Sequence, residues 1–388
     1  MSVFYRERRL PPYVFAEVNR MKLEKRHAGV DVIDFGMGNP DMPPAPHIIE
    51  KLKEVAADPR AHRYSSSMGI PALRKAVGRY YERRFNVALD AEKEICVTLG
   101  SKEGLASFAT AVTAPGDTIL VPDPSYPIHM FGFIIAGAAV RPVTFGDPEH
   151  FFAEVSAACR RSVPAPTVLV LNFPSNPTTQ TVDLDFYREA VKLAKQYNLI
   201  IISDLAYSEI YFDGNPPPSI LEVPEAREVA IEFTSMSKTY SMPGWRMGFA
   251  AGSERLIGAL KLVKSYLDYG AFTPIQVAAI AALDGPQDGI EENRRVYRER
   301  RDCLVESFGR AGFDVPSPPA TMFAWAPIPE KYRELGSLEF SKRLLDETGV
   351  AVSPGLGFGE RGDGFVRLAL VENPQRIRQA ARAMTGFF

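Results

Sequence analysis

A lysine flanked by hydroxyl side chains is the strongest chemical signal in this sequence. Lys238 follows Ser235 and Ser237, and Arg246 lies eight positions further on. Hydroxyl groups and a guanidinium can bind a phosphate dianion, while a lysine amine can attack an aldehyde. The segment therefore has the groups that a ligand with a phosphate and an aldehyde needs. Taken alone, a Ser-x-Ser-Lys sequence is more often a solvated loop, and the spacing of a P-loop is absent here.

An acidic residue follows an apolar run upstream of this lysine. Asp204 comes directly after the stretch 199–203, and Tyr207 lies three positions further on. Open α/β sheets bind ligands at the carboxyl ends of their parallel strands, which is where this carboxylate would lie. Pyridoxal phosphate, which has both an aldehyde and a phosphate, needs an acid beside its pyridine nitrogen so that the ring can accept electrons. An isolated aspartate at a strand end is more often a helix cap or a turn residue.

Three further segments offer groups that suit the same cofactor. Asn176 follows the apolar run 167–171 and, like Tyr207, could hydrogen-bond a phenolic oxygen, although Asn-Pro is also a common turn. The sequence Gly100-Ser101-Lys102 begins a predicted helix directly after a strand, where free backbone N–H groups bind anions. Tyr126, in a loop that contains two prolines, could stack on a flat ring. Each signal is modest by itself.

Strand-like and helix-like segments alternate through the middle of the chain and would position these residues. Short apolar runs separated by amphipathic helices are typical of a mostly parallel sheet that is covered by helices on both faces. The predicted strands are 95–99, 118–121, 140–145, 167–171, 199–203, 229–234 and 247–250, and the predicted helices include 101–114, 128–136, 151–161 and 183–197. The expected fold class is therefore α/β.

The character of the sequence changes after residue 283. A break with Gly and Pro precedes a charged helical stretch over about 290–311, and short strands, Pro-rich turns and a basic terminal helix follow. We expect a large domain over 46–290 that binds the cofactor. The segments 1–45 and 291–388 are expected to form a smaller α/β domain.

Composition and charge favour an enzyme that acts on small molecules. The net charge of −2 over 388 residues gives no basic excess for nucleic acid. The apolar stretch 131–140 is too short to span a membrane, and the three cysteines and five histidines show no disulfide or metal-ligand spacing. We expect a cytoplasmic protein without a metal, a nucleic-acid partner or membrane association. The five histidines are expected to be solvated or to pack.

Taken together, the order and spacing of these segments resemble the class I/II aminotransferases of the fold-type I pyridoxal-phosphate family. The resemblance covers nearly the whole chain from about residue 10 and is greatest to the bacterial glutamate–pyruvate (alanine) aminotransferases. It rests on Leu10-Pro-Pro-Tyr-Val-Phe, Asp34-Phe-Gly-Met-Gly-Asn-Pro-Asp, Gly100-Ser-Lys-Glu-Gly-Leu, Asp204-Leu-Ala-Tyr, Lys264-Ser-Tyr-Leu-Asp-Tyr-Gly-Ala-Phe-Thr-Pro and Val352-Ser-Pro-Gly-Leu-Gly-Phe-Gly.

The resemblance implies a role for each residue of the predicted cofactor site. Lys238 would carry pyridoxal phosphate as a Schiff base and, with Asp204 and Tyr207, would form the catalytic set. Asp204 would pair with the pyridine nitrogen, and Tyr126 would stack on the ring. The implied contacts of the phenolic oxygen are Asn176 and Tyr207, and those of the phosphate are Ser101, Lys102 through its backbone, Ser235, Ser237 and Arg246. Tyr64 would reach the phosphate of the neighbouring subunit's cofactor, which implies a homodimer with shared active sites.

The resemblance also implies a substrate site. Arg367 would bind the substrate α-carboxylate, helped by Gly38 and Asn176, and Tyr13 is assigned to the same site. The role of Arg367 also makes chemical sense by itself. The α-carboxylate is the one fixed anion that an amino acid and a keto acid share, and the planar guanidinium fits it. An arginine that stood alone would more often form a surface ion pair.

The reaction implied is a ping-pong transamination. An L-amino acid, expected to be alanine, and 2-oxoglutarate would give pyruvate and glutamate through a Lys238 aldimine. The segment 264–274 has no arginine for a second carboxylate, which is compatible with alanine as donor. An LL-diaminopimelate, broad-range or aspartate aminotransferase remains an alternative, as does a C–S β-lyase of similar fold. A regulatory module without turnover would need an added DNA-binding segment, and none is evident. The glycine-rich stretch 355–362 precedes a strand and is interpreted as a loop beside Arg367, not as a dinucleotide fingerprint.

Overall fold

The computed structural model describes residue 4, residues 7–11 and residues 14–388. Tyr13, which the sequence assigns to the substrate site, lies outside these residues. Among the helices of the described part of the chain, none is both long and apolar enough to cross a membrane.

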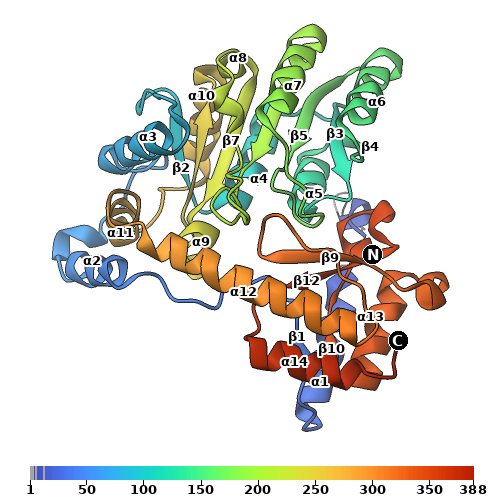
Figure 1. The fold of residues 1–388 in the computed structure, drawn as a ribbon. Coiled ribbons are helices and arrows are strands. Elements are labelled where there is room, and N and C mark those ends of the chain that lie inside the picture. The colour runs from blue at the N-terminus through green and yellow to red at the C-terminus, as the bar shows by residue number, and fades with distance from the viewer. Residues whose placement is uncertain (1–3, 5–6, 12–13) are drawn as a thin grey trace.

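A sheet of seven described strands forms the centre of the larger part of the molecule (Figure 1). The strands lie in the order β2-β8-β7-β6-β5-β3-β4, and β8 runs antiparallel to both of its neighbours while the others are parallel to one another. Their bounds are Ile95–Thr98 (β2), Thr118–Asp123 (β3), Ala139–Thr144 (β4), Pro166–Leu171 (β5), Ile200–Asp204 (β6), Ala230–Ser235 (β7) and Gly248–Gly252 (β8). The predicted α/β fold with a mostly parallel sheet is confirmed.

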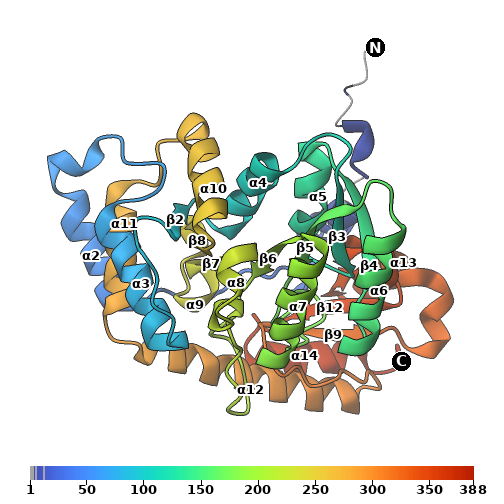
Figure 2. The ribbon, with the colours of Figure 1, turned by 90° about the horizontal axis from the view of Figure 1, so that it is seen from above.

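Helices cover both faces of this sheet (Figures 1 and 2). In β5, Val168 and Val170 pack on the face that carries α4, α5 and α10, whereas Leu169 and Leu171 pack on the face that carries α3, α6 and α7. Because both faces are buried, the strand reads as a continuous apolar run. The helix bounds are Pro71–Phe85 (α3), Ser101–Val112 (α4), Pro127–Ala136 (α5), Pro148–Arg161 (α6), Leu184–Tyr197 (α7) and Glu254–Leu267 (α10).

The direction of the strands explains why the predicted site residues can meet. The six strands other than β8 are parallel, so their carboxyl ends lie at one edge of the sheet, and β8 begins at that edge. Asp204 ends β6, Ser235 ends β7 and Arg246 lies two residues before the start of β8. This edge is where open α/β sheets bind ligands.

The C-terminal part of the chain forms a second group of elements around its own apolar core. A small antiparallel sheet has the order β11-β12-β9, with bounds Ser353–Pro354, Phe365–Ala369 and Phe323–Pro327. Helices Gly336–Thr348 (α13) and Pro374–Met384 (α14) pack with it. The predicted limits of the two domains, 46–290 against 1–45 with 291–388, stay a prediction.

Segments from the beginning of the chain reach this second group. Strand β1 (Ile33–Asp34) pairs in parallel with β10 (Val350–Ala351), and helix α1 (Val14–His27) packs on α13. The long helix α12 (Asp288–Arg310) runs from the side of α2 (Pro46–Ala56) and α11 (Thr273–Asp284) to α14 (Figure 1). A single rigid element therefore connects the two groups.

Candidate active site

A cavity of about 700 Å³ lies between the carboxyl edge of the large sheet and the small sheet. Every predicted site residue of the described chain except Tyr64 lines it. These residues are Gly38, Ser101, Lys102, Tyr126, Asn176, Asp204, Tyr207, Ser235, Ser237, Lys238, Arg246 and Arg367. Residues that are 329 positions apart, from Gly38 to Arg367, thus face one space.

Lys238 lies in a short helical turn, α9 (Met236–Thr239), directly after β7. Its Nζ donates a hydrogen bond to the carbonyl oxygen of Gly38 at 3.0 Å. Burial, together with the cations Arg367 and Arg246, lowers the pKa of this amine to about 8. A lysine with a lowered pKa has a larger neutral fraction, which is the form that attacks a carbonyl or accepts a proton.

Asp204 is buried and is held by a histidine. Its Oδ2 lies 2.8 Å from His129 Nε2, and its Oδ1 accepts a hydrogen bond from the backbone N–H of Ala206 at 3.2 Å. The other ring nitrogen of His129 lies 2.8 Å from the hydroxyl of Ser125. His129 is 1% exposed, so it is neither solvated nor merely packed, and the sequence interpretation missed its polar role. The position of the histidine three residues after Tyr126 gave no signal by itself.

Asn176 connects a cation to a phenol at the centre of the cavity. Its side-chain oxygen accepts a hydrogen bond from Arg367 Nη1 at 2.8 Å, and its side-chain nitrogen lies 3.5 Å from the Tyr207 hydroxyl. The backbone N–H of Asn176 donates to Asn172, whose amide in turn donates to the carbonyl oxygen of Asp204 at 2.8 Å. Burial raises the pKa of the Tyr207 hydroxyl well above its ordinary value, although Arg367 opposes this shift. The hydroxyl is therefore a proton donor throughout the physiological range of pH.

Arg367 lies on β12, and two aromatic rings fix its guanidinium. The guanidinium carbon lies 4.0 Å from the ring centre of Phe323 and 4.6 Å from that of Phe358. Its Nη2 also donates to Ser353 Oγ at 3.5 Å. Cation–π contacts of this kind hold the planar group in one orientation. Neither aromatic residue was predicted from the sequence: Phe323 lies 44 positions before Arg367, and Phe358 lies in the predicted neighbouring loop, where nothing marked its ring as a partner of the guanidinium.

A glycine-containing loop beside β12 supplies one of these rings. Two short 3-10 helices, Gly355–Phe358 and Glu360–Gly362, connect β11 to β12. They open no βαβ unit, so the interpretation of this stretch as a loop beside the Arg367 strand is confirmed.

The opposite end of the cavity is suited to a phosphate. Helix α4 begins at Ser101, and no side chain caps the N–H groups of its first turn. Because Ser101 and Lys102 line this end of the cavity, these N–H groups can bind an anion there. A Cβ atom at Gly100 would lie 2.4 Å from Arg246 Nη2, so only glycine lets the guanidinium approach the start of the helix. Ser235 and Ser237 line the same cavity, and Ser235 Oγ accepts a hydrogen bond from the Ser237 N–H at 3.2 Å.

Tyr126 and Lys102 lie together on another wall. Tyr126 is the residue before α5, and its ring centre is 6.0 Å from Lys102 Nζ. The ring also makes an edge contact with His129 at 5.9 Å between centres. A flat ligand held by Asp204 at one edge would therefore have an aromatic face beside it.

Tyr64 is the one described site residue that the structure does not bring to the cavity. It is 86% exposed, and its ring packs on Tyr269 at 4.7 Å between centres. The segment that follows Tyr269 also contacts residues 65–70. The side-chain amide of Gln276 donates a hydrogen bond to the Ser65 hydroxyl and accepts one from the backbone N–H of Ile70. Tyr64 therefore does not line the cavity of its own chain.

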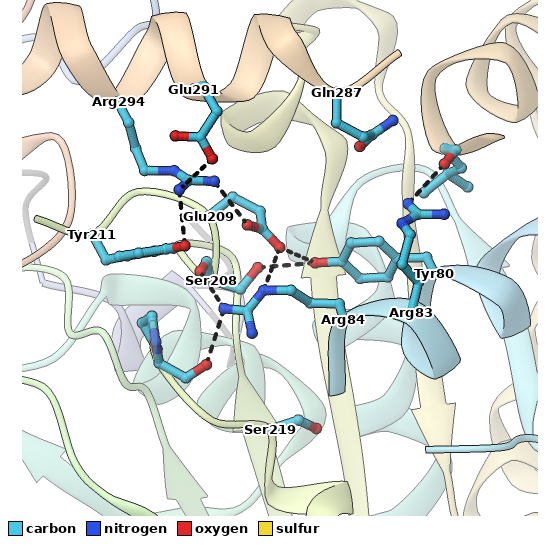
Figure 3. A network of polar contacts seen from close by, with 12 residues as sticks. Tyr80, Arg83, Arg84, Ser208, Glu209, Tyr211, Ser219, Gln287, Glu291 and Arg294 are labelled. Atoms are coloured by element: carbon cyan, nitrogen blue, oxygen red, sulfur yellow. Dashed lines mark hydrogen bonds and ion pairs between the residues drawn. The ribbon is translucent and has the colours of Figure 1, made fainter. Parts of the chain in front are cut away.

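A buried carboxylate supports the segment that carries Tyr207 (Figure 3). Glu209 accepts hydrogen bonds from the Tyr80 hydroxyl at 2.8 Å and from Arg84 Nε at 3.0 Å, both on α3. Its other oxygen lies 3.6 Å from Arg294 Nη2 on α12. The network therefore ties the loop after β6 to one helix of each group of elements. The sequence interpretation did not identify it.

The cavity as a whole fits the cofactor that the sequence implies. Its phosphate end combines the uncapped N-terminus of α4 with Arg246, and the buried acid Asp204 lines the same cavity. The amine of Lys238 lies between these two ends and Arg367. Gly100, with a φ of +84°, lets the Arg246 guanidinium lie close against the start of α4, so the two phosphate-binding groups come together. The donor set is that of a pyridoxal-phosphate site with a carboxylate-binding arginine.

Comparison with known proteins gives a family match over most of the chain. The family described as "Aminotransferase class I and II" matches residues 30–384. The chain is 62% identical over 387 residues to a putative aminotransferase, AatC, of Rhizobium meliloti, covering 100% of this chain and 96% of the relative. It is 52% identical over 385 residues to the glutamate-pyruvate aminotransferase AlaC of Escherichia coli, covering 99% and 93%.

More distant matches carry other names. An LL-diaminopimelate aminotransferase of Moorella thermoacetica is 43% identical over 375 residues, covering 97% of this chain and 95% of that relative. Among solved structures, substrate-bound BacF of Bacillus subtilis superposes with a TM-score of 0.92 at 31% identity, covering 100% of this chain and 98% of that one.

Proposed function

This chain belongs to the class I and II aminotransferases, and from that premise we propose that it transfers the amino group of L-alanine to 2-oxoglutarate. The products would be pyruvate and glutamate. The observation that carries this proposal is the 52% identity to the glutamate-pyruvate aminotransferase over 99% of the chain. The absence of arginine from 264–274 is compatible with a donor whose side chain carries no carboxylate.

The enzyme uses pyridoxal 5′-phosphate, which supplies an aldehyde and an electron-accepting ring. We assign Lys238 as the covalent attachment site, because its amine has a lowered pKa and faces the cavity. Asp204 would hold a proton at the ring nitrogen, and His129 would keep the carboxylate oriented. Ser101, Lys102, Ser235, Ser237 and Arg246 would bind the phosphate. Tyr126 would stack on the ring, and Asn176 and Tyr207 would bind its phenolic oxygen.

The substrate would enter with its α-carboxylate on Arg367. The two N–H groups of the guanidinium fork fit a carboxylate, and the aromatic rings on either side hold the fork in place. Asn176 already bonds Arg367, and the backbone of Gly38 lies beside it, so both would help to orient the same group. Tyr13 is proposed for the same site. With the carboxylate fixed, the Cα–H bond can be aligned with Lys238, whose Nζ would accept the proton.

We propose that the active enzyme is a homodimer in which each subunit completes the other's site. Tyr64 is exposed and does not line its own cavity, and its ring packs on Tyr269. Leu262, Tyr266, Leu267 and Phe272, all close to Tyr269 along the chain, are exposed as well. Exposed apolar surface of this kind is typical of a protein interface. A second copy of the chain would cover this surface and would receive Tyr64 at its phosphate end.

The test of the proposed reaction is the absorbance of the purified holoenzyme before and after L-alanine is added alone. We expect the visible band to disappear with L-alanine and to return when 2-oxoglutarate is added. An absorbance band that does not change with L-alanine but disappears with LL-diaminopimelate would favour a second candidate function, that of an LL-diaminopimelate aminotransferase. The 43% identity to the Moorella enzyme supports this candidate. Release of a thiol from cystathionine without a keto-acid requirement would instead indicate a C–S β-lyase.

A further inference from the structure

Five cationic side chains line the active-site cavity in the described part of the chain, and one of them has no role so far. They are Lys22, Lys102, Lys238, Arg246 and Arg367, whereas Asp204 is the single acidic residue of the lining. Arg246 lies at the proposed phosphate end, to which Lys102 would contribute its backbone N–H while its ammonium lies 6.0 Å from the Tyr126 ring centre. Lys238 would hold the cofactor, and Arg367 would bind the α-carboxylate. Lys22 remains as a cation without an anion from the ligands considered so far.

Lys22 reaches the cavity because one face of α1 forms part of its wall. The lining residues of this helix are Phe15, Val18, Asn19 and Lys22. Their spacing of three, four and seven positions places them on one side of an α-helix. Phe15 and Val18 form an apolar wall, and Asn19 and Lys22 add an amide and an ammonium group to it.

Lys22 is buried and has donors to spare. It is 5% exposed, and its Nζ lies 2.9 Å from Asp34 Oδ2. Among the described residues, this carboxylate is its one hydrogen-bond acceptor, and an ammonium group has three N–H donors. Arg26 also contacts Asp34, at 3.4 Å, so Lys22 is not the sole cation of that carboxylate. Its charge is therefore available to a second anion.

A short chain of hydrogen bonds connects Lys22 to Arg367 along one wall. Asp34 Oδ1 accepts from the Gly36 N–H at 2.9 Å, and the Gly36 carbonyl accepts from Ser353 Oγ at 2.7 Å. Ser353 Oγ in turn lies 3.5 Å from Arg367 Nη2. The two cations therefore lie at the same end of the cavity, away from the phosphate end, with their separation set by the backbone around Gly36.

We propose that Lys22, assisted by the amide of Asn19, binds the distal carboxylate of a dicarboxylic keto acid or amino acid whose α-carboxylate lies on Arg367. The inference rests on the proposed function, since it assigns the residue that recognises the five-carbon partner of the reaction. A second carboxylate buried in this cavity needs a cation, because an unpaired anion is strongly destabilised there. Alanine and pyruvate have no such group and leave Lys22 with Asp34. One cavity can thus accept both partners.

The test compares a dicarboxylate with a monocarboxylate of equal chain length. Binding of glutarate and of pentanoate to the holoenzyme is measured by calorimetry, and the KM values for 2-oxoglutarate and pyruvate are measured in parallel. The variants are Lys22→Met, Lys22→Met with Asp34→Asn, and Lys25→Met as the control. Lys25 lies on the same helix and pairs with Asp346 at 2.9 Å, and it does not line the cavity. The double variant removes both charges, so Asp34 is not left buried without a partner.

We expect Lys22→Met to weaken the binding of glutarate by a factor at least about tenfold larger than the factor for pentanoate. This difference corresponds to the loss of a charge-assisted hydrogen bond. The KM for 2-oxoglutarate should rise by a similar factor relative to that for pyruvate. The double variant should repeat both ratios, and Lys25→Met should leave them as in the wild type. Equal weakening of the two ligands, or a wild type that binds glutarate no better than pentanoate, would overturn the inference.

The two proposals fail in different ways. If L-alanine does not donate but glutarate binding depends on Lys22, the alanine assignment falls and the role of Lys22 stands. If alanine and 2-oxoglutarate react but the ratio of glutarate to pentanoate affinity is the same in Lys22→Met as in the wild type, only the role of Lys22 is wrong.

Discussion

At the scale of single residues, the reactivity of Lys238 follows from where its amine lies. Burial comes first, and the positive charges of Arg367 and Arg246 add to it, so that the pKa falls to about 8. An amine with a lowered pKa is neutral above that pH and charged below it. The rate at which pyridoxal phosphate attaches to the apoenzyme should therefore rise with pH and level off above about 8.

This pH dependence is measured by stopped-flow absorbance after the cofactor is added at a series of pH values. Replacement of the partly exposed Lys51 by Met is the control and should leave the midpoint unchanged. A midpoint near the ordinary lysine pKa of about 10.4 would show that the amine is not perturbed.

Arg367 should be sensitive even to a substitution that keeps its charge. Arg367→Lys removes the planar fork and the stacking on Phe323 and Phe358. We expect kcat/KM for amino acids and keto acids alike to fall by about 10- to 100-fold, from the loss of one charge-assisted hydrogen bond. Steady-state kinetics with both substrates measures the effect, and Arg376→Lys, at the surface pair with Asp31, is the matched control. Unchanged kinetics in Arg367→Lys would remove this residue from the substrate site.

At the scale of elements, the loop after β6 depends on the Glu209 network in Figure 3. The Glu209 side chain is 5% exposed and faces Arg84 and Arg294. Removing one partner of a buried ion pair leaves the others uncompensated, so Glu209→Ala should lower the free energy of unfolding by about 3–5 kcal/mol. Glu291 is the 70% exposed partner of Arg294, and Glu291→Ala should lower the free energy of unfolding by less than about 1 kcal/mol. Urea denaturation of the holoenzyme distinguishes the two, and equal losses would contradict the importance of Glu209.

The elements that carry the site were predictable because their signals are local. The strand 199–203 and the helix 101–114 differ from the observed β6 and α4 by only one or two residues at their ends. Apolar runs bounded by polar residues fix such strands, and an acid or a serine directly after one is then placed at the sheet edge. This is why Asp204 and Ser101 could be assigned before their surroundings were known.

Contacts between distant segments could not be read in the same way. The bond between His129 and Asp204 joins residues 75 positions apart, and Arg367 reaches Asn176 across 191 positions. No local pattern specifies which buried polar groups will meet, since that depends on how whole elements pack. Phe323 and Lys22 escaped prediction for the same reason. The resemblance assigns Tyr64 to the neighbouring subunit's site, and this assignment stays a prediction; within its own chain the side chain is exposed and packs on Tyr269.

At the scale of the whole molecule, the exposed apolar side chains of Tyr266 and Leu267 support the proposed second subunit. Each of these side chains is more than half exposed. We expect sedimentation equilibrium to give about twice the mass of one chain. Replacement of both residues by Asp should shift the population to monomer and lower the affinity for pyridoxal phosphate, because Tyr64 would lose its partner site. Leu335→Asp, on an exposed position of another element, is the control. A wild type that is monomeric with full cofactor affinity would contradict the shared site.

We propose that Lys238 carries the cofactor in the cavity at the sheet edge, and this attachment can be tested directly. The most direct measurement is reduction of the holoenzyme with borohydride, followed by proteolysis and mass spectrometry. Reduction fixes the cofactor on the lysine to which it is bound, and the modified peptide identifies that residue. We predict that the added mass lies on Lys238 and that Lys238→Ala abolishes it. A modified peptide that contains Lys22, Lys102 or any other lysine in the wild type, or no modified peptide at all, would contradict the account.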